Sequence, residues 1–75
     1  MAGRPALRVN NRVRELREAR SWSQARLGDQ LDVSRQTINA IETGKYDPSL
    51  PLAFRIAREF GQPIESIFLF DEDTP

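Results

Sequence analysis

The segment from Ser23 to Gly44, SQARLGDQLDVSRQTINAIETG, constrains the fold of this chain more than any other. It contains two stretches of helical periodicity, interrupted at Asp32-Val33. In the second stretch, a rotation of about 100° per residue separates an apolar side from a polar side. The apolar side holds Val33, Thr37, Ile38 and Ile41, and the polar side holds Arg35, Gln36, Asn39 and Thr43. The segment therefore predicts two short helices joined by a tight turn, the second of them buried on one face.

The size and composition of the chain limit the classes of protein to which it can belong. With 75 residues it makes one small domain, near the lower limit for a self-sufficient core. Cysteine and histidine are both absent, which removes disulfides and the commonest general base and metal ligand. The longest apolar run, residues 67–70, is too short to span a bilayer. We expect a cytoplasmic protein that is not an enzyme and binds no metal or cofactor.

Charge is distributed unevenly along the chain, although the net charge is zero. Residues 1–46 hold nine basic and five acidic residues, a net charge of +4. Residues 47–75 hold two basic and six acidic residues, a net charge of −4. Such a dipole suits a polyanionic partner at the basic end, and a mixed solvated surface is the alternative interpretation.

Capping residues divide the chain into five predicted helices. Asn10 or Asn11 is suited to cap the first helix, whose apolar positions are Val9, Val13, Leu16 and Ala19. The next three helices have serine caps at Ser23, Ser34 and Ser49, and the fifth begins at Pro63. The fourth helix has an inward face of Ala53, Ile56, Ala57 and Phe60. We predict an all-α domain over residues 9–70, a flexible N-terminal arm over residues 1–8 and an acidic tail over residues 71–75.

The polar face of the third predicted helix has the chemistry that reads bases in a DNA major groove. Arginine pairs with guanine, and glutamine or asparagine pairs with adenine. A plain solvated helix face is the alternative. Two further features each allow two interpretations. The arginines of residues 4–14 favour either solubility or a minor-groove contact, and Trp22 either packs in the core or stacks on a base.

The run W-S-Q-x-x-L-x-x-x-L-x-V-S-R-x-T-I-x-x-I-E-x-G-K-x-x-P-S-L, from Trp22 to Leu50, resembles the helix-turn-helix domain of the Xre family. This is the Cro and phage-repressor type, and the likeness is greatest to its very short stand-alone members. The resemblance extends over residues 9–68. It implies a five-helix fold like that of lambda repressor and a transcriptional regulator, most simply a repressor. Such a regulator binds a pseudo-palindromic operator in double-stranded DNA as a homodimer.

The resemblance also assigns roles to individual residues. It implies base contacts by Arg35, Gln36, Asn39 and Ala40. It implies contacts to DNA phosphates by Gln24, Ser34, Thr43, Lys45 and Tyr46. It places Arg17 opposite Glu42 in an internal salt bridge. Two positions depart from the family pattern, which usually has alanine where this chain has Gly28 and glycine where it has Asp32. We expect Gly28 to lower helix propensity, and Asp32 to adopt a positive φ.

Several apolar residues near the C-terminus do not fit the inward face of the fourth helix. We expect a two-fold dimer interface built from Leu52, Phe54, Ile64, Phe68, Leu69 and Phe70. In this interface, residues 68–70 form a short strand that pairs with its symmetry mate. Coverage of the domain's own core is the alternative for some of these residues. An alternative function is a protein-interaction module, antitoxin-like or anchoring, with weak DNA binding. No small-molecule effector is expected.

Overall fold

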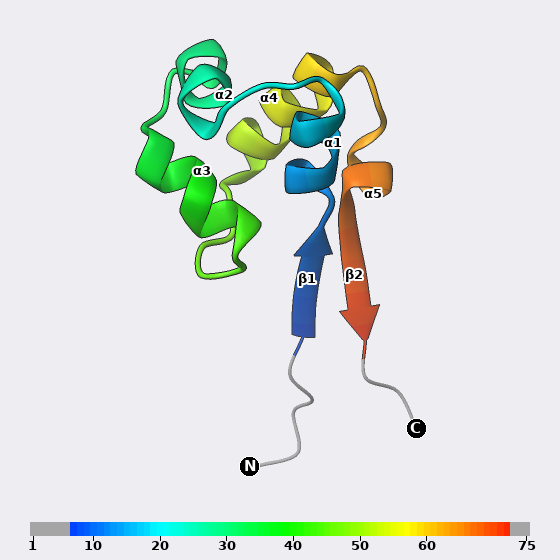
Figure 1. Cartoon of the computed structure of the whole chain (residues 1–75). Helices are drawn as coiled ribbons and strands as arrows, with labels where there is room; N and C mark the ends of the chain where they lie inside the picture. Colours follow the sequence, from blue (N-terminus) through cyan, green and yellow to red (C-terminus); the bar gives the residue numbers. More distant parts are fainter. Residues whose placement is uncertain (1–6, 73–75) are drawn as a thin grey trace.

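The computed structural model describes residues 7–72 and contains five helices and two short strands (Figure 1). In chain order these are β1 (Leu7–Asn11), α1 (Val13–Ala19), α2 (Gln24–Leu31), α3 (Arg35–Glu42), α4 (Leu50–Phe60), α5 (Ile64–Ile67) and β2 (Phe68–Glu72). The prediction of a mainly helical fold with five helices is confirmed. The strand β1 was not predicted.

Serine side chains start the three middle helices, as predicted. The hydroxyl oxygens of Ser23, Ser34 and Ser49 accept backbone N–H bonds from Arg26, Thr37 and Leu52 at 3.0, 3.0 and 3.3 Å, respectively. Each bond satisfies one N–H of the first helical turn that has no partner within the helix. These local bonds explain why the sequence located the beginnings of α2, α3 and α4 correctly.

The first helix begins later than its apolar periodicity suggested. The Asn11 side chain accepts the backbone N–H of Val13 at 3.1 Å and so supports the start of α1, although Arg12 is the residue at the N-cap. Val9 lies in β1 and pairs with Phe70, so its assignment to the first helix is wrong. The backbone pairing of β1 with β2 competes with helix formation there and prevails.

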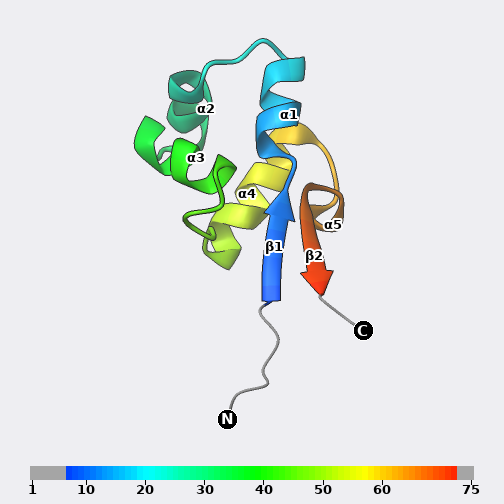
Figure 2. The same ribbon diagram turned by 60° about the horizontal axis from the view of Figure 1, so that its bottom comes forward.

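The two strands form an antiparallel ribbon that projects from the helices (Figures 1 and 2). Their register runs from Leu7 opposite Glu72 to Asn11 opposite Phe68. The predicted C-terminal strand is therefore present, but it pairs with the N-terminal segment of its own chain. The predicted arm and tail boundaries shift too, because residues 7–8 and 71–72 lie in the strands. Residues 1–6 and 73–75 lie outside the described part of the chain.

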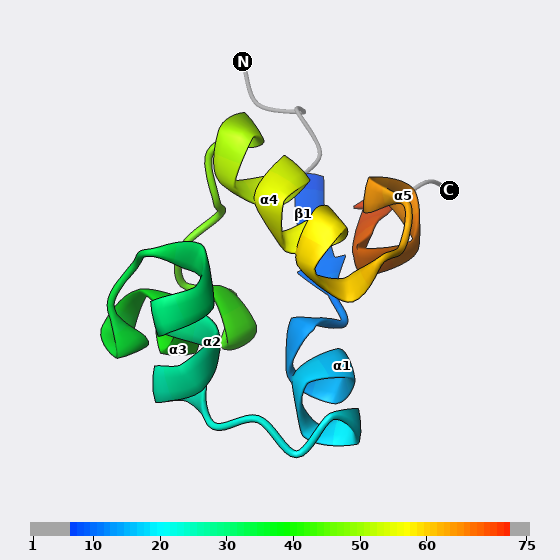
Figure 3. The same cartoon turned by 90° about the horizontal axis from the view of Figure 1, so that it is seen from above.

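The hydrophobic core lies where all five helices meet (Figure 3). The largest fully buried side chains are Val13, Leu27, Leu31, Ile38, Ile41, Ile56 and Ile67. Full burial of a valine, leucine or isoleucine side chain contributes about 1.5–3 kcal/mol, so these seven residues dominate the stability of the domain. The helix α4 buries its predicted face and also Leu52, which is only 8% exposed. The expectation that Leu52 lies on the outer surface is wrong, because it turns into the core one position before Ala53.

None of the helices in residues 7–72 is long and apolar enough to cross a membrane.

Candidate nucleic-acid interface

A tight turn fixes the angle between α2 and α3. Asp32 ends α2 in the left-handed conformation, with φ 61° and ψ 41°, as expected from its position. The N–H of Val33 donates to the carbonyl of Gly28 at 2.9 Å. A Cβ atom on Gly28 would lie 2.7 Å from the Val33 carbonyl oxygen, which is closer than such atoms approach in proteins. Gly28 therefore does more than lower helix propensity: it allows the turn to pack directly on α2.

The helix α3 has one buried and one exposed side. Ile38 and Ile41 have no exposed surface, and they hold the helix against the core. Arg35, Gln36 and Asn39 are exposed on the opposite side. Together with Gln24 of α2, these three residues line a polar hollow of about 250 Å³. The predicted base-contacting residues thus come together on one surface, and Ala40 lies half-buried on the same helix.

A buried ion pair ties α3 to α1. The Arg17 guanidinium donates from Nε to Glu42 Oε2 at 2.7 Å and from Nη2 to Glu42 Oε1 at 3.1 Å. The two side chains are only 10% and 2% exposed. The hydrogen bond to Glu42 raises the pKa of Arg17, and its remaining donor binds the Trp22 carbonyl at 2.8 Å. The predicted salt bridge is present, with the bidentate geometry that makes such pairs strong.

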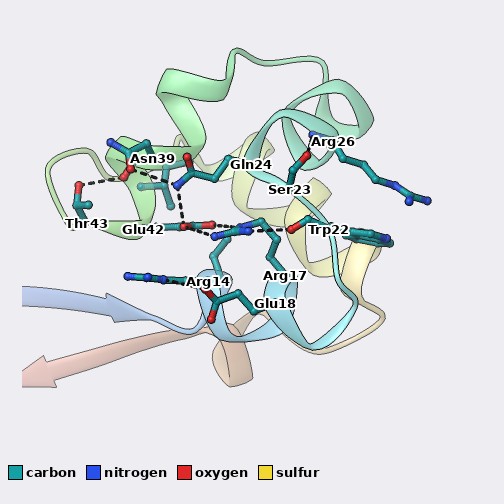
Figure 4. A network of polar contacts seen from close by, with 12 residues as sticks. Arg14, Arg17, Glu18, Trp22, Ser23, Gln24, Arg26, Asn39, Glu42 and Thr43 are labelled. Atoms are coloured by element: carbon teal, nitrogen blue, oxygen red, sulfur yellow. Dashed lines mark hydrogen bonds and ion pairs between the residues drawn. The ribbon is translucent and has the colours of Figure 1, made fainter.

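The side chain of Gln24 connects this ion pair to the exposed face of α3 (Figure 4). Its Nε2 atom donates to Glu42 Oε1 at 3.1 Å and to Asn39 Oδ1 at 3.2 Å. Among the residues that the structure describes, Arg35 and Gln36 have no such internal partner. Their side chains are therefore free to bind a ligand, whereas Asn39 is held in place.

Comparisons with known proteins agree with this geometry. A helix-turn-helix family model matches residues 13–67. The chain belongs to the Xre-type helix-turn-helix family. It is 51% identical over 65 residues to an uncharacterized HTH-type transcriptional regulator of Methanocaldococcus jannaschii, covering 87% of this chain and 98% of that one. It is 43% identical over 66 residues to YgzD, an uncharacterized HTH-type transcriptional regulator of Bacillus subtilis, covering 88% and 100% of the two chains.

A comparison with solved structures also supports a helix-turn-helix fold. The restriction-modification controller protein C.AhdI of Aeromonas hydrophila superposes with a TM-score of 0.67 at 27% identity, over 73% of this chain and 80% of that chain. With the family assignment, this makes the protein a DNA-binding transcriptional regulator. The α2–turn–α3 segment is its helix-turn-helix.

The residues predicted to contact phosphates fall into two groups in this regulator. Lys45 and Tyr46 follow α3 and expose their side chains. The other three residues, Gln24, Ser34 and Thr43, already form side-chain hydrogen bonds within the protein. Gln24 donates to Glu42 and Asn39, Ser34 Oγ lies 2.9 Å from Thr37 Oγ1, and the Thr43 hydroxyl donates to the Asn39 carbonyl at 2.9 Å.

Trp22 packs against the core, which is the first of its two predicted roles. Its ring stacks on Phe60 with centroids 5.8 Å apart, and the guanidinium groups of Arg20 and Arg26 lie 5.1 and 5.4 Å from its centre. Arg20 also donates to the carbonyls of Glu59 and Phe60 at 3.1 and 3.0 Å, at the end of α4.

Two long-range contacts that position the helices were not predicted from the sequence. One is the pair of bonds from Arg20 to the end of α4, and the other is the bond from the Asn11 amide to the Ile41 carbonyl at 2.9 Å. Basic residues near a helix C-terminus are a known capping signal, but the pairing of Arg20 with α4 joins residues 39 positions apart. No local pattern in the sequence indicates such a contact.

Proposed function

We propose that this regulator is a repressor that binds a pseudo-palindromic operator as a homodimer and reads bases with α3. The observation that carries the proposal is the exposed row of Arg35, Gln36 and Asn39 on a helix whose other face is fully buried. A rigid helix with exposed guanidinium and amide groups suits the major groove. In this assignment Arg35 reads guanine, Gln36 and Asn39 read bases with amides, and Ala40 touches a thymine methyl group.

Contacts to the DNA backbone flank this row. Lys45 and Tyr46 supply an ammonium and a phenol immediately after α3. At the start of α2, the hydroxyl and the carbonyl oxygen of Ser23 accept the N–H groups of Arg26 and Leu27, respectively. The N–H groups of Gln24 and Ala25 precede these in the first turn and have no acceptor within the helix. They suit a phosphate oxygen, because the N-terminus of a helix carries partial positive charge.

An apolar surface on α4, α5 and the start of β2 supports the proposed homodimer. Leu50, Phe54 and Leu69 are 64%, 53% and 43% exposed. Next to them lies a groove of about 340 Å³, formed by the loop before α4, by α4 and α5, and by the start of β2. Its lining is mainly apolar and consists of Asp47, Pro48, Leu50, Ala53, Ile64, Glu65 and Phe68. So much exposed apolar surface on a small domain favours association with a second copy. Leu52 leaves the predicted interface because it belongs to the core, Leu50 joins it, and the side chain of Phe70 lies outside the described part.

Selection of bound DNA from a random pool tests the proposed reading of bases. We expect one site with two-fold symmetry and half-sites about one helical turn apart. Arg35→Ala should weaken binding to this site about 5- to 150-fold and leave binding to unrelated DNA nearly unchanged. The matched control is Arg58→Ala, an exposed arginine on α4. Equal losses in the two variants, or failure of the wild type to select any sequence, would favour the protein-interaction module instead.

Sedimentation tests the proposed dimer. We expect the wild type to be dimeric at tens of micromolar and Phe54→Lys to be monomeric, because a lysine at the centre of an apolar interface must lose its hydration. Phe54 is half exposed, so the variant should keep its helical circular dichroism. Asp29→Lys, with the same new side chain on the exposed face of α2, should remain dimeric. A monomeric wild type would refute this part of the proposal.

A further inference from the structure

The carboxylate of Glu42 controls the orientation of a neighbouring amide. Its Oε2 accepts from Arg17, and its Oε1 accepts from both Arg17 and Gln24. A carboxylate has acceptors only, and both oxygens of Glu42 already accept from the Arg17 guanidinium. Gln24 must therefore turn its NH₂ group toward Glu42, because the opposite orientation would place two oxygens face to face.

The same constraint passes from Gln24 to Asn39. The NH₂ group of Gln24 has two protons, and it donates to both Glu42 Oε1 and Asn39 Oδ1, at 3.1 and 3.2 Å. Since this partner is a donor, Asn39 must turn its oxygen toward Gln24. Figure 4 shows the amide nitrogen of Asn39 on the side away from Gln24. The polarity of both amides is thus set by one buried charge.

We propose that Glu42, acting through Gln24, fixes the Asn39 amide so that it presents its NH₂ group to the DNA and reads a base through an acceptor atom. This inference rests on the proposed function, since it requires that Asn39 contacts a base. In the major groove, guanine, adenine and thymine offer acceptors, whereas cytosine offers only its N4 amino donor. The base that Asn39 contacts is therefore not cytosine.

The inference changes the role of Gln24. A phosphate has acceptors only, and both protons of the Gln24 amide already have acceptors within the protein. A contact from this side chain to a phosphate would release Asn39 or leave Glu42 with one donor fewer. Gln24 is thus a positioning residue for Asn39, and the phosphate at the start of α2 is left to backbone N–H groups.

Two substitutions of Gln24 separate this role from the alternatives. Gln24→Met keeps the length and helix propensity of the side chain but removes its donors, and it leaves the bonds between Arg17 and Glu42 intact. Gln24→Lys supplies donors only, so it preserves the polarity of the relay. The control is Lys45→Ala, which removes a proposed phosphate contact.

The first readout needs no DNA. NMR relaxation of side-chain NH₂ groups should show Asn39 as rigid as the backbone in the wild type and in Gln24→Lys. In Gln24→Met, Asn39 should become as mobile as Gln36, which has no internal partner among the described residues and serves as the reference. An Asn39 group that is as mobile as Gln36 in the wild type would overturn the inference, whatever the DNA experiments show.

The second readout is binding to all single-base variants of the selected site. A mismatch typically weakens binding about 5- to 150-fold. In Gln24→Met, the ratio of affinities for the selected and the mismatched base pair should fall below about 3-fold at one position of each half-site and stay unchanged at the others. In Gln24→Lys, this ratio should stay unchanged at every position. Lys45→Ala should weaken binding to all sequences by the same factor. A uniform loss of affinity for all sequences in Gln24→Met would show that Gln24 only holds the DNA backbone, and it would refute the relay.

Discussion

The helix-turn-helix and the β-ribbon lie at different places on the same small domain and are held together by different forces (Figure 1). The α2–turn–α3 segment has buried isoleucines beneath it and side-chain bonds from Arg17, Gln24 and Asn11 around it. The ribbon is a two-stranded ladder that meets the helices only at one end, where Asn11 of β1 bonds to Ile41 and Phe68 of β2 packs against the core. From this contrast we expect the recognition surface to be rigid before DNA arrives and the ribbon to be the less stable of the two regions.

The largest expected effect comes from cutting the network beneath α3. Glu42→Ala leaves the Arg17 guanidinium buried without its partner, and such a loss commonly costs about 3–5 kcal/mol of unfolding free energy. Urea unfolding followed by circular dichroism would measure it. The control is Glu18→Ala, whose exposed pair with Arg14 at 3.2 Å should contribute less than about 0.5 kcal/mol. Similar midpoints for the two variants would mean that the recognition half does not depend on this ion pair.

The same contrast explains what the sequence could and could not predict. Helix starts, the turn at Asp32 and the exposed row on α3 follow from patterns within a few residues, and the family resemblance located Arg17 and Glu42. The ribbon joins residues 7–11 to residues 68–72, and no local pattern indicates that pairing. Leu52 was misplaced because helical periodicity near the start of α4 leaves one position of uncertainty. The bonds of Gln24 depend on side-chain geometry that spacing alone does not provide.

Hydrogen exchange would compare the two regions directly. An isolated two-stranded ladder is only marginally stable, so we expect amides of β1 and β2 to exchange on the order of 100-fold faster than those of α3. The measurement should be made at two protein concentrations. If a second copy covers the ribbon, its protection should rise with concentration while that of α3 stays constant. Equal protection of ribbon and α3 at high dilution would remove the proposed contrast.

A methyl group at the turn would test how tightly the recognition half is packed. Gly28→Ala gains about 1 kcal/mol of helix propensity, but its Cβ would lie 2.7 Å from the Val33 carbonyl oxygen. Because the obstacle is backbone, we expect a net loss of about 1–2 kcal/mol in thermal or urea unfolding. Ala25→Gly, on the exposed side of the same helix, controls for propensity alone. A Gly28→Ala variant more stable than the wild type would show that the turn yields easily.

The smallest expected effect is a gain in stability at the same turn. Asp32 has φ 61°, a conformation that costs an ordinary residue strain and glycine none, and its negative charge lies at the unfavourable end of the α2 dipole. Asp32→Gly should therefore raise the unfolding free energy by about 0.5–1 kcal/mol, less than the strain relieved because glycine also loses more entropy on folding. Ser21→Gly is the matched comparison, since Ser21 has φ 59° in the loop before α2 but carries no charge. If only Asp32→Gly stabilises the protein, the gain is electrostatic. If neither does, the left-handed residues that frame α2 are not under strain, and the rigidity of the recognition half comes from side-chain bonds and core packing alone.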